Sequence, residues 1–529
     1  MGSRPNLDRL PLLLLLRAAL AHVPGATVGI DLGTTNSAIA ILRDGAPVIV
    51  PNGRGELTTP SAVAFAADGT TLVGTDALEQ AASNVANTVY AAKRFIGRPL
   101  ARVRGYVKNV GFAVIDAGDD AVAFEIPAVG APVTPEEASA HLLRALLDDA
   151  ESATGTRAER AVITVPAYFD DRQRRATRAA AALAGLTEVD LLAEPVAASL
   201  AYGLSGAVGT LVVFDLGAGT FDVSVLRRSA SGDVEVVATS GDARLGGNDF
   251  DAALVAWLEK QGAAQGWELQ GDQAAMRQLA DAAEAAKKRL SVVKSVQVAR
   301  PYADADAAAT TDASSPGSTA AHVELSREQL EQLCDPILRR LRTPLYEAAL
   351  TARITLPGEL EPEYGKPKRQ LSRKARRAAA KLRPEGRQKY LPTGDAVDEV
   401  ILVGGATHMV AVRKLVANVF GVDPRRTVDP MQAVALGAAV HAGVLAGEVG
   451  GTRVLQAWQA QLGRMLEPGG GGEESAASDD VSDLVGELSD GTQPSEGAAE
   501  EESQDAAESA EEEAAVAAWL AAQRKAAGT

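Results

Sequence analysis

The stretch Val28-Gly29-Ile30-Asp31-Leu32-Gly33-Thr34-Thr35-Asn36-Ser37 decides the fold, because it returns as Val213-Phe214-Asp215-Leu216-Gly217-Ala218-Gly219-Thr220-Phe221-Asp222. Each copy has the pattern of a buried strand that ends in an aspartate, a tight glycine-rich turn and a second strand. The glycines let backbone N–H groups approach phosphate oxygens, and the Thr and Ser hydroxyls add hydrogen bonds. The aspartate suits Mg²⁺, which travels with polyphosphates. Two copies predict two lobes that face one phosphate.

The alternative phosphate-binding motifs do not fit this chain. No G-x-x-x-x-G-K-[ST] or G-x-G-x-x-G run follows a predicted strand and opens a helix. We therefore expect hairpin turns, and not the N-termini of helices, to hold the phosphates.

The charge of the chain is concentrated in one segment. Of 529 residues, 46% are hydrophobic, which is typical of a globular protein with two or three domains, and the formal net charge is −17. Residues 473–513 carry 16 acidic residues and no Lys or Arg, so the rest of the chain is almost neutral. A folded part without a strong field does not favour nucleic-acid binding.

Cys334 is the single cysteine and falls in a helical pattern of leucines. One cysteine excludes an intrachain disulfide, and no Cys or His cluster has the spacing of a zinc site. We expect a buried, inert thiol.

Both ends and one internal segment differ from the rest of the chain. Residues 1–25 form a leader or extension whose apolar run is too short to span a bilayer; a secretory leader, an organellar transit peptide and a cytosolic extension remain open. Residues 357–396 form a basic insertion, with 11 Lys or Arg against 3 Glu in 361–390. It is a solvated insert or, alternatively, a patch for RNA, acidic lipid or a localisation receptor. Residues 450–529 form an acidic, low-complexity tail that we expect to be disordered.

Strand and helix patterns alternate along the chain. Alternating and β-branched runs predict strands at 28–31, 37–42, 48–50, 62–65, 161–165, 211–214, 223–226, 234–239 and 399–403. Amphipathic spacing predicts helices at 135–152, 170–184, 248–262, 272–294, 326–352 and 409–420. Strands interleaved with helices predict an α/β fold.

Three further motifs make the assignment more specific. They are Lys93-Arg94-Phe95-Ile96-Gly97-Arg98, Ile163-Thr164-Val165-Pro166-Ala167-Tyr168-Phe169 and Gly246-Gly247-Asn248-Asp249-Phe250-Asp251. Together with the two hairpins, they resemble the DnaK branch of the 70-kDa heat-shock chaperones, and residues 442–449 are most similar to bacterial and plastid members. The resemblance runs from about residue 27 to residue 449, interrupted by 357–396.

The resemblance implies an actin-like, two-lobed ATPase fold, in which duplicated mixed sheets are flanked by helices and ATP lies between the lobes. The nucleotide-binding domain would occupy residues 26–449, with lobe I at about 26–208 and lobe II at about 209–427. The hairpins, taken as residues alone, predict the same geometry.

The resemblance also assigns catalytic roles. Lys93 would be the catalytic lysine, which places the attacking water and neutralises charge as the γ-phosphate leaves, while Asp222 or a neighbouring acid receives the proton. Glu194 and Asp222 would complete the shell of magnesium and water. Thr220 is the fourth residue in the catalytic set.

Ligand binding is implied at a larger set of positions. The metal sites would be Asp31 and Asp215. The implied phosphate-binding residues are Gly33, Thr34, Thr35, Asn36, Gly217, Gly219, Gly246 and Gly247. Adenosine recognition would fall on Glu284, Lys287, Lys288, Ser291, Gly404 and Gly405. The first four of these share one helical face, although their spacing is also typical of an exposed, salt-bridged stripe. Pro166 and Arg174 match the relay through which the family communicates nucleotide state between its lobes.

Several positions depart from the family pattern. Ala218 stands where the second hairpin usually has Gly, so a methyl group could crowd the phosphates or resist the required dihedral angles. His408 replaces an Arg beside the adenine, and Met431 replaces an acid. Ala193 and Val196 replace polar residues around Glu194-Pro195.

The function implied is that of a heat-shock-type ATP-binding protein with slow, Mg²⁺-dependent ATP hydrolysis, coupled to chaperone systems. The ligands would be ATP and ADP with Mg²⁺, and K⁺ is a further candidate. Residues 450–529 are too poor in apolar residues to form the family's peptide-binding β-sandwich, so we expect no direct client site.

The alternatives are a catalytically weak, nucleotide-dependent partner of co-chaperones, and a sugar kinase with the same paired hairpins. We expect J-domain co-chaperones and nucleotide exchange factors as partners, no nucleic acid and no transmembrane span. The location would be a plastid or another organelle, or otherwise the cytoplasm.

Overall fold

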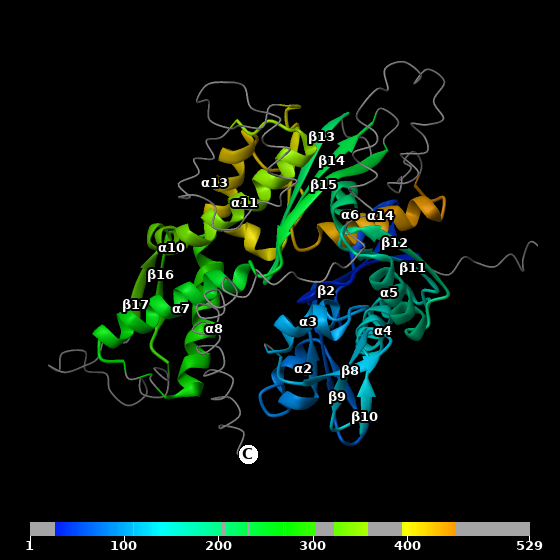
Figure 1. Cartoon of the computed structure of the whole chain (residues 1–529), viewed down its shortest axis with the longest axis horizontal. Helices are drawn as coiled ribbons and strands as arrows, with labels where there is room; N and C mark the ends of the chain where they lie inside the picture. The colour runs from blue at the N-terminus through cyan, green and yellow to red at the C-terminus, as the bar shows by residue number, and fades with distance from the viewer. Residues whose placement is uncertain are drawn as a thin grey trace, which may run out of the picture.

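The computed structural model describes residues 27–449 apart from 109, 203–207, 230–232, 268, 270, 302–321 and 358–393. The predicted leader, nearly all of the basic insertion and the acidic tail therefore lie outside the described residues. Figure 1 shows two groups of sheets and helices that meet near the middle of the molecule. Among the helices of the described ranges, none is both long and apolar enough to cross a membrane.

The first large sheet is built around the first hairpin. Strand β1 (Thr27–Asp31) pairs antiparallel with β2 (Asn36–Arg43) and parallel with β11 (Arg160–Val165). The strand order is β12-β11-β1-β2-β3, with β12 at Glu188–Ala193 and β3 at Ala46–Ile49, and the short β4 (Thr59–Pro60) also pairs with β2. The hairpin thus lies in the interior of the sheet.

The second large sheet repeats this arrangement. Strand β13 (Gly209–Leu216) pairs antiparallel with β14 (Phe221–Arg228) and parallel with β18 (Glu399–Val403), and β15 (Val234–Asp242) follows on the outer side of β14. Both sheets therefore contain an antiparallel hairpin whose first strand has a parallel partner on its other edge. The α/β fold predicted from interleaved strands and helices, with the duplicated mixed sheets that the resemblance implies, is confirmed.

Three smaller sheets complete the two halves. The N-terminal half carries β6-β5-β7 (Thr71–Val73, Ala62–Phe65, Thr88–Tyr90) and β10-β9-β8 (Ala131–Val133, Ala121–Ile126, Ala113–Gly118). The C-terminal half carries β16 (Ser295–Ala299) and β17 (His322–Ser326). The short helices α2 (Thr75–Glu79) and α3 (Leu100–Val107) and the 3-10 turns η2 (Val85–Asn87) and η3 (Ala92–Arg94) lie in the N-terminal half.

Helices α4 (Pro135–Thr154) and α5 (Asp171–Leu183) begin at side-chain caps. Helix α4 has a capping box between Thr134 and Glu137, and α5 has one between Asp170 and Gln173. Each box satisfies N–H groups that the helix itself leaves open. Together with α7 (Gly247–Ala264) and α13 (Val410–Phe420), these helices confirm four of the predicted segments.

Two helix predictions were wrong in their extent. Helix α8 (Gln273–Leu290) ends four residues before the predicted boundary at 294, because the chain turns at residues 291–294 and Arg327 donates to the carbonyls of Leu290 and Val293. The predicted helix 326–352 is two helices, α10 (Arg327–Leu333) and α11 (Asp335–Ala352). They meet at Cys334, and Pro336, which has no N–H, follows in the first turn of α11.

Cys334 is a buried free thiol, as expected. Burial raises its pKa to about 12, so the reactive thiolate is not formed near neutral pH.

The last described helix returns to the first sheet. Helix α14 (Ala433–Leu445) packs on β1, β2, β3 and β11 and against α6 (Glu194–Ala201). Gly29 allows this approach, since a Cβ at Gly29 would lie 2.1 Å from the backbone N of Ala439. Residues from both large sheets, together with α6 and α14, share one buried apolar cluster. The two sheets that carry the hairpin turns are therefore joined through one shared apolar cluster.

Candidate functional site

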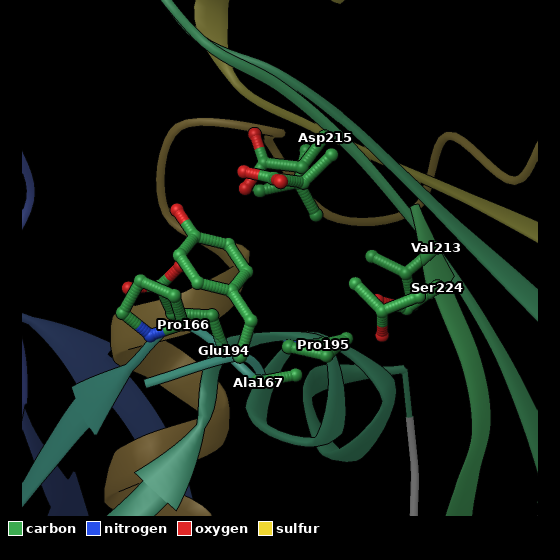
Figure 2. Close-up of a pocket in the computed structure, with 11 residues that line it drawn as sticks. Pro166, Ala167, Glu194, Pro195, Val213, Asp215 and Ser224 are labelled. Carbon is green, nitrogen blue, oxygen red and sulfur yellow. The ribbon is translucent and has the colours of Figure 1, made fainter. Parts of the chain in front are cut away.

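Four carboxylates gather where the two large sheets face each other. Asp31 ends β1, Glu194 opens α6, and Asp215 and Asp222 lie directly opposite each other in the β13–β14 pairing. Figure 2 shows Asp215 on one side of a pocket with Glu194 and Pro166 on the other, and Ser224 along the neighbouring strand. The repeated motif thus brings acids from both halves of the chain to one place.

Lys93 is the cation of this cluster. It lies in η3 with only 9% of its side chain exposed, and its Nζ forms an ion pair with Glu194 Oε1. Burial acts to lower the pKa of Lys93, but the carboxylates of Glu194, Asp31 and Asp215 outweigh it and the pKa is raised. The amine therefore remains charged at neutral pH.

The environment of these carboxylates disfavours their charged forms and raises their pKa values. Burial raises the pKa of Asp31 to about 6, with Lys93 acting against the shift. Burial and then Glu194 raise the pKa of Asp222 to about 7. The pKa of Asp215 is raised as well, by burial first and then by Glu194, Asp222 and Asp31. A cation placed among these groups would relieve their mutual repulsion.

The cluster fits a magnesium ion that brings ligands of its own. Among the described residues, no three acidic, His or Cys side chains converge closely enough to form a protein-only metal cage. Mg²⁺ in proteins usually keeps several waters and takes one or two carboxylates together with substrate phosphates. Asp31 and Asp215, one from each hairpin, match that smaller demand.

A hydroxyl network holds the first hairpin turn, residues 32–35. Gly33 N donates to Ser37 Oγ at 3.1 Å, Ser61 Oγ donates to Gly33 O at 2.9 Å, and the two serine hydroxyls are 2.9 Å apart. Thr164 Oγ1 donates to Asp31 Oδ1 at 3.2 Å. Around this turn, Thr34 and Asn36 are half-buried and Thr35 is exposed. The sequence predictions missed Ser61 and Thr164, although Thr164 stood inside a quoted motif.

The second hairpin turn, residues 217–220, is braced by a glycine loop. Gly217 N donates to Thr220 O at 3.0 Å, and Gly247 N donates to Gly217 O at 2.9 Å. A Cβ at Gly246 would lie 2.4 Å from Gly219 N, so only glycine permits this packing. The structure therefore brings together five of the predicted residues: Gly217, Gly219, Thr220, Gly246 and Gly247.

Ala218 does not strain the second turn. Its φ is not positive, so this position does not take the left-handed conformation that favours glycine. The expected dihedral conflict is not present.

The ammonium group of Lys287 is bound by two groups of α7. Its Nζ donates to Asp251 Oδ2 at 2.6 Å and to Gly247 O at 3.1 Å, which ties α8 to the start of α7. Lys288 forms an exposed ion pair with Glu284 at 2.6 Å, as the salt-bridged alternative anticipated. Ser291 follows the end of α8, so it lies in the turn and not on the helix.

The second glycine pair follows β18. Gly404 has a φ of 84°, and a Cβ there would lie 2.3 Å from Leu216 O. Gly405 opens the 3-10 turn η4 (Gly405–His408), and Met431 Sδ lies 3.5 Å from where its Cβ would be. The pair therefore adjoins the end of β13, next to Asp215.

Of the proposed relay residues, Pro166 lies in the loop after β11 and Arg174 lies on α5. Pro166 lines the pocket (Figure 2). Arg174 on α5 donates through Nε to Phe169 O at 2.9 Å and through its guanidinium to Ala167 O at 3.5 Å. Burial and the neighbouring Arg178 lower the pKa of Arg174. This arginine therefore holds the loop that carries Pro166.

Comparisons with known proteins agree on one family for this chain. A family model described as Hsp70 protein matches residues 27–357 and 390–458. The chain is 41% identical over 454 residues to the chloroplastic stromal 70 kDa heat shock-related protein of Pisum sativum, covering 85% of this chain and 57% of that protein. It is 41% identical over 443 residues to chaperone protein dnaK3 of Thermosynechococcus vestitus, covering 83% and 58%.

The similarity to bacterial proteins is equally strong. The chain is 42% identical over 440 residues to chaperone protein DnaK of Thermus thermophilus, covering 82% of this chain and 63% of that protein. The chain thus spans roughly 57–63% of the length of these relatives. On the family match and on these identities, this chain belongs to the Hsp70 family, with bacterial and plastid relatives.

Proposed function

We propose that this chain binds ATP and ADP with Mg²⁺ between its two hairpins and hydrolyses ATP slowly as part of a chaperone system. The observation that carries this proposal is the buried Lys93–Glu194 ion pair, which lies among acids from both hairpins. A buried lysine beside carboxylates provides the charge that phosphoryl transfer needs. The domain proposed for this activity is 26–449, with lobes at about 26–208 and 209–427.

Each part of the site has a role in the proposed reaction. The N–H groups of the two turns and the Thr220 hydroxyl hold phosphate oxygens. Asp31 and Asp215 would hold Mg²⁺, directly or through water, and the bound ion would supply positive charge beside the phosphates. Lys93 places the attacking water and offsets the charge on the leaving phosphoryl group. Asp222, whose pKa lies near neutrality, receives the proton, with Glu194 beside it.

The remaining expectations are supported by the relatives. Two of the similar proteins are chloroplastic, from Pisum sativum and Arabidopsis thaliana, which supports a plastid location. Several are named chaperones, which supports J-domain co-chaperones and nucleotide exchange factors as partners. We include K⁺ as a further ion for the same oxygen-rich site.

The decisive variant is Lys93→Ala. We expect steady-state ATP turnover to fall about 100-fold or more, while MgATP binding measured by calorimetry persists, because the turns and carboxylates remain. The matched control is Lys414→Ala, which removes an exposed lysine paired with Glu331 and should leave turnover unchanged. Equal turnover in the wild-type protein and Lys93→Ala would sink the proposal.

A further inference from the structure

Arg94, the residue after Lys93, reaches from the first half of the chain to the second. One guanidinium nitrogen lies 3.2 Å from Gly219 O, and another lies 3.4 Å from Ala243 O. Gly219 belongs to the second hairpin turn, and Ala243 follows β15. A single side chain therefore ties η3 to two carbonyls of the opposite half.

Aromatic residues of the first half of the chain hold the Arg94 guanidinium in place. Its central carbon lies 4.9 Å from the centre of the Tyr106 ring, on α3. Tyr106 in turn meets the buried Phe95 edge to face, with ring centres 6.4 Å apart. A cation stacked on an aromatic face loses little further freedom when it forms hydrogen bonds.

A second arginine, from the second half of the chain, contacts α3. A Cβ at Gly105 on α3 would lie 3.0 Å from a guanidinium nitrogen of Arg244, which follows β15. In Figure 1, α3 lies at the margin of the first half that faces β14 and β15. Helix α3 therefore receives contacts from both halves.

The contact at Gly219 O also sets the direction of a phosphate donor. In a trans peptide, the carbonyl of Gly219 and the N–H of Thr220 lie in one plane and point in opposite directions, and the described residues contain no cis peptide bond. Fixing the carbonyl with Arg94 thus fixes the aim of the Thr220 N–H. The glycine loop at 246–247 packs on the same turn.

We propose that Arg94, supported by Tyr106, is a positioning residue that latches the two lobes through the second hairpin turn and thereby slows the release of bound nucleotide. The proposal rests on the proposed function, because the latch acts on the turn assigned to phosphate. Opening the lobes must break both charged hydrogen bonds. Losing them should raise the rate of nucleotide dissociation about tenfold.

The first experiment measures that rate. The protein is loaded with Mg²⁺ and a fluorescent N-methylanthraniloyl ADP, which is then displaced with excess unlabelled ADP. Arg94→Gln should release the analogue about tenfold faster than the wild-type protein. Tyr106→Leu should have a smaller effect in the same direction, whereas Tyr106→Phe keeps the ring face and should behave as wild type.

Two comparisons separate a latch from a general loss of structure. Arg54→Gln removes an arginine whose ion pairs with Asp76 and Glu79 stay within one lobe, and it should not change the rate. The double variant Arg94→Gln/Tyr106→Leu should release nucleotide no faster than Arg94→Gln alone, because Tyr106 acts through Arg94. Additive effects would overturn the proposed coupling.

A nucleotide-free measurement keeps the latch separate from the proposed function. Hydrogen exchange at the amides of residues 217–221 should be faster in Arg94→Gln and in Tyr106→Leu than in the wild-type protein or Tyr106→Phe. If the wild-type protein binds no nucleotide, the proposed function fails while exchange still decides the latch. Unchanged hydrogen exchange in a folded Arg94→Gln protein would overturn the latch. If Arg94→Gln does not fold, unchanged exchange in Tyr106→Leu would overturn it instead.

Discussion

Arg353 ends α11 in a left-handed conformation, with a φ of 53°. A Cβ makes this conformation unfavourable, by about 1 kcal/mol or more, and glycine is the residue that helix ends usually place there. We therefore expect Arg353→Gly to raise the free energy of unfolding by about 0.5–1 kcal/mol. Urea denaturation followed by circular dichroism measures the change.

Arg353→Ala is the matched control for this prediction. It removes the same exposed guanidinium but keeps the Cβ, so it should gain no stability. If both variants were stabilised equally, the gain would come from the lost charge and not from the backbone.

At single residues, sequence reasoning succeeded where one motif carries all the information and failed where partners are distant in the chain. The acids of the two hairpins could be predicted because each follows its own strand. Ser61 could not, because it is 28 residues away from the turn whose carbonyl it binds. Lys93 needed the family resemblance, since nothing local distinguishes a buried catalytic lysine from an exposed one.

At the level of elements, α14 depends on small residues for its place. A Cβ at Gly437 would lie 1.7 Å from the carbonyl oxygen of Ala197 on α6. Alanine would favour the helix by about 1 kcal/mol, but a backbone oxygen cannot rotate away, so the clash should dominate. We expect Gly437→Ala to lower the free energy of unfolding by about 1–3 kcal/mol, measured by thermal unfolding.

Gly53→Ala serves as the comparison for Gly437→Ala. Nothing lies within 4 Å of a Cβ at Gly53, and its φ is not positive, so this variant should unfold like the wild-type protein. A neutral Gly437→Ala would mean that α14 does not pack as tightly as described.

The elements that were predicted have strong local patterns, whereas the missed ones include short strands and the apolar helix α14 (Ala433–Leu445). Each strand of both hairpins was predicted because it is buried and β-branched. The break between α10 and α11 was missed because leucine spacing continues across Cys334. Strands β16 and β17 have only five residues each, so their pairing depends on contacts that a local pattern does not contain.

At the level of the whole molecule, the repeat predicted two facing halves but not the contacts that join them. Arg94 stood in a quoted motif, yet its carbonyl partners are 125 and 149 residues away. The same holds for α14, whose apolar residues give no indication that it returns to the first sheet. Chain duplication can be read from a sequence, whereas the interface between the copies depends on tertiary packing.

The carboxylates that meet between the halves predict how stability depends on pH. The pKa of Asp222 is raised from 3.8 to about 7, so the folded nucleotide-free protein retains a proton that the unfolded chain has released. The free energy of unfolding therefore falls as pH rises from about 4 to 7. Asn does not titrate, so Asp222→Asn should be more stable than the wild-type protein at pH 8, by on the order of 2–4 kcal/mol.

That advantage of Asp222→Asn should shrink as pH is lowered toward 5, because the wild-type carboxyl then keeps its proton in the folded state. Urea unfolding of both proteins at pH 5, 6, 7 and 8, without nucleotide or Mg²⁺, tests this. A stability difference between the wild-type protein and Asp222→Asn that stays constant from pH 5 to 8 would contradict the raised pKa of Asp222. The cation expected among these acids would then have no repulsion to relieve.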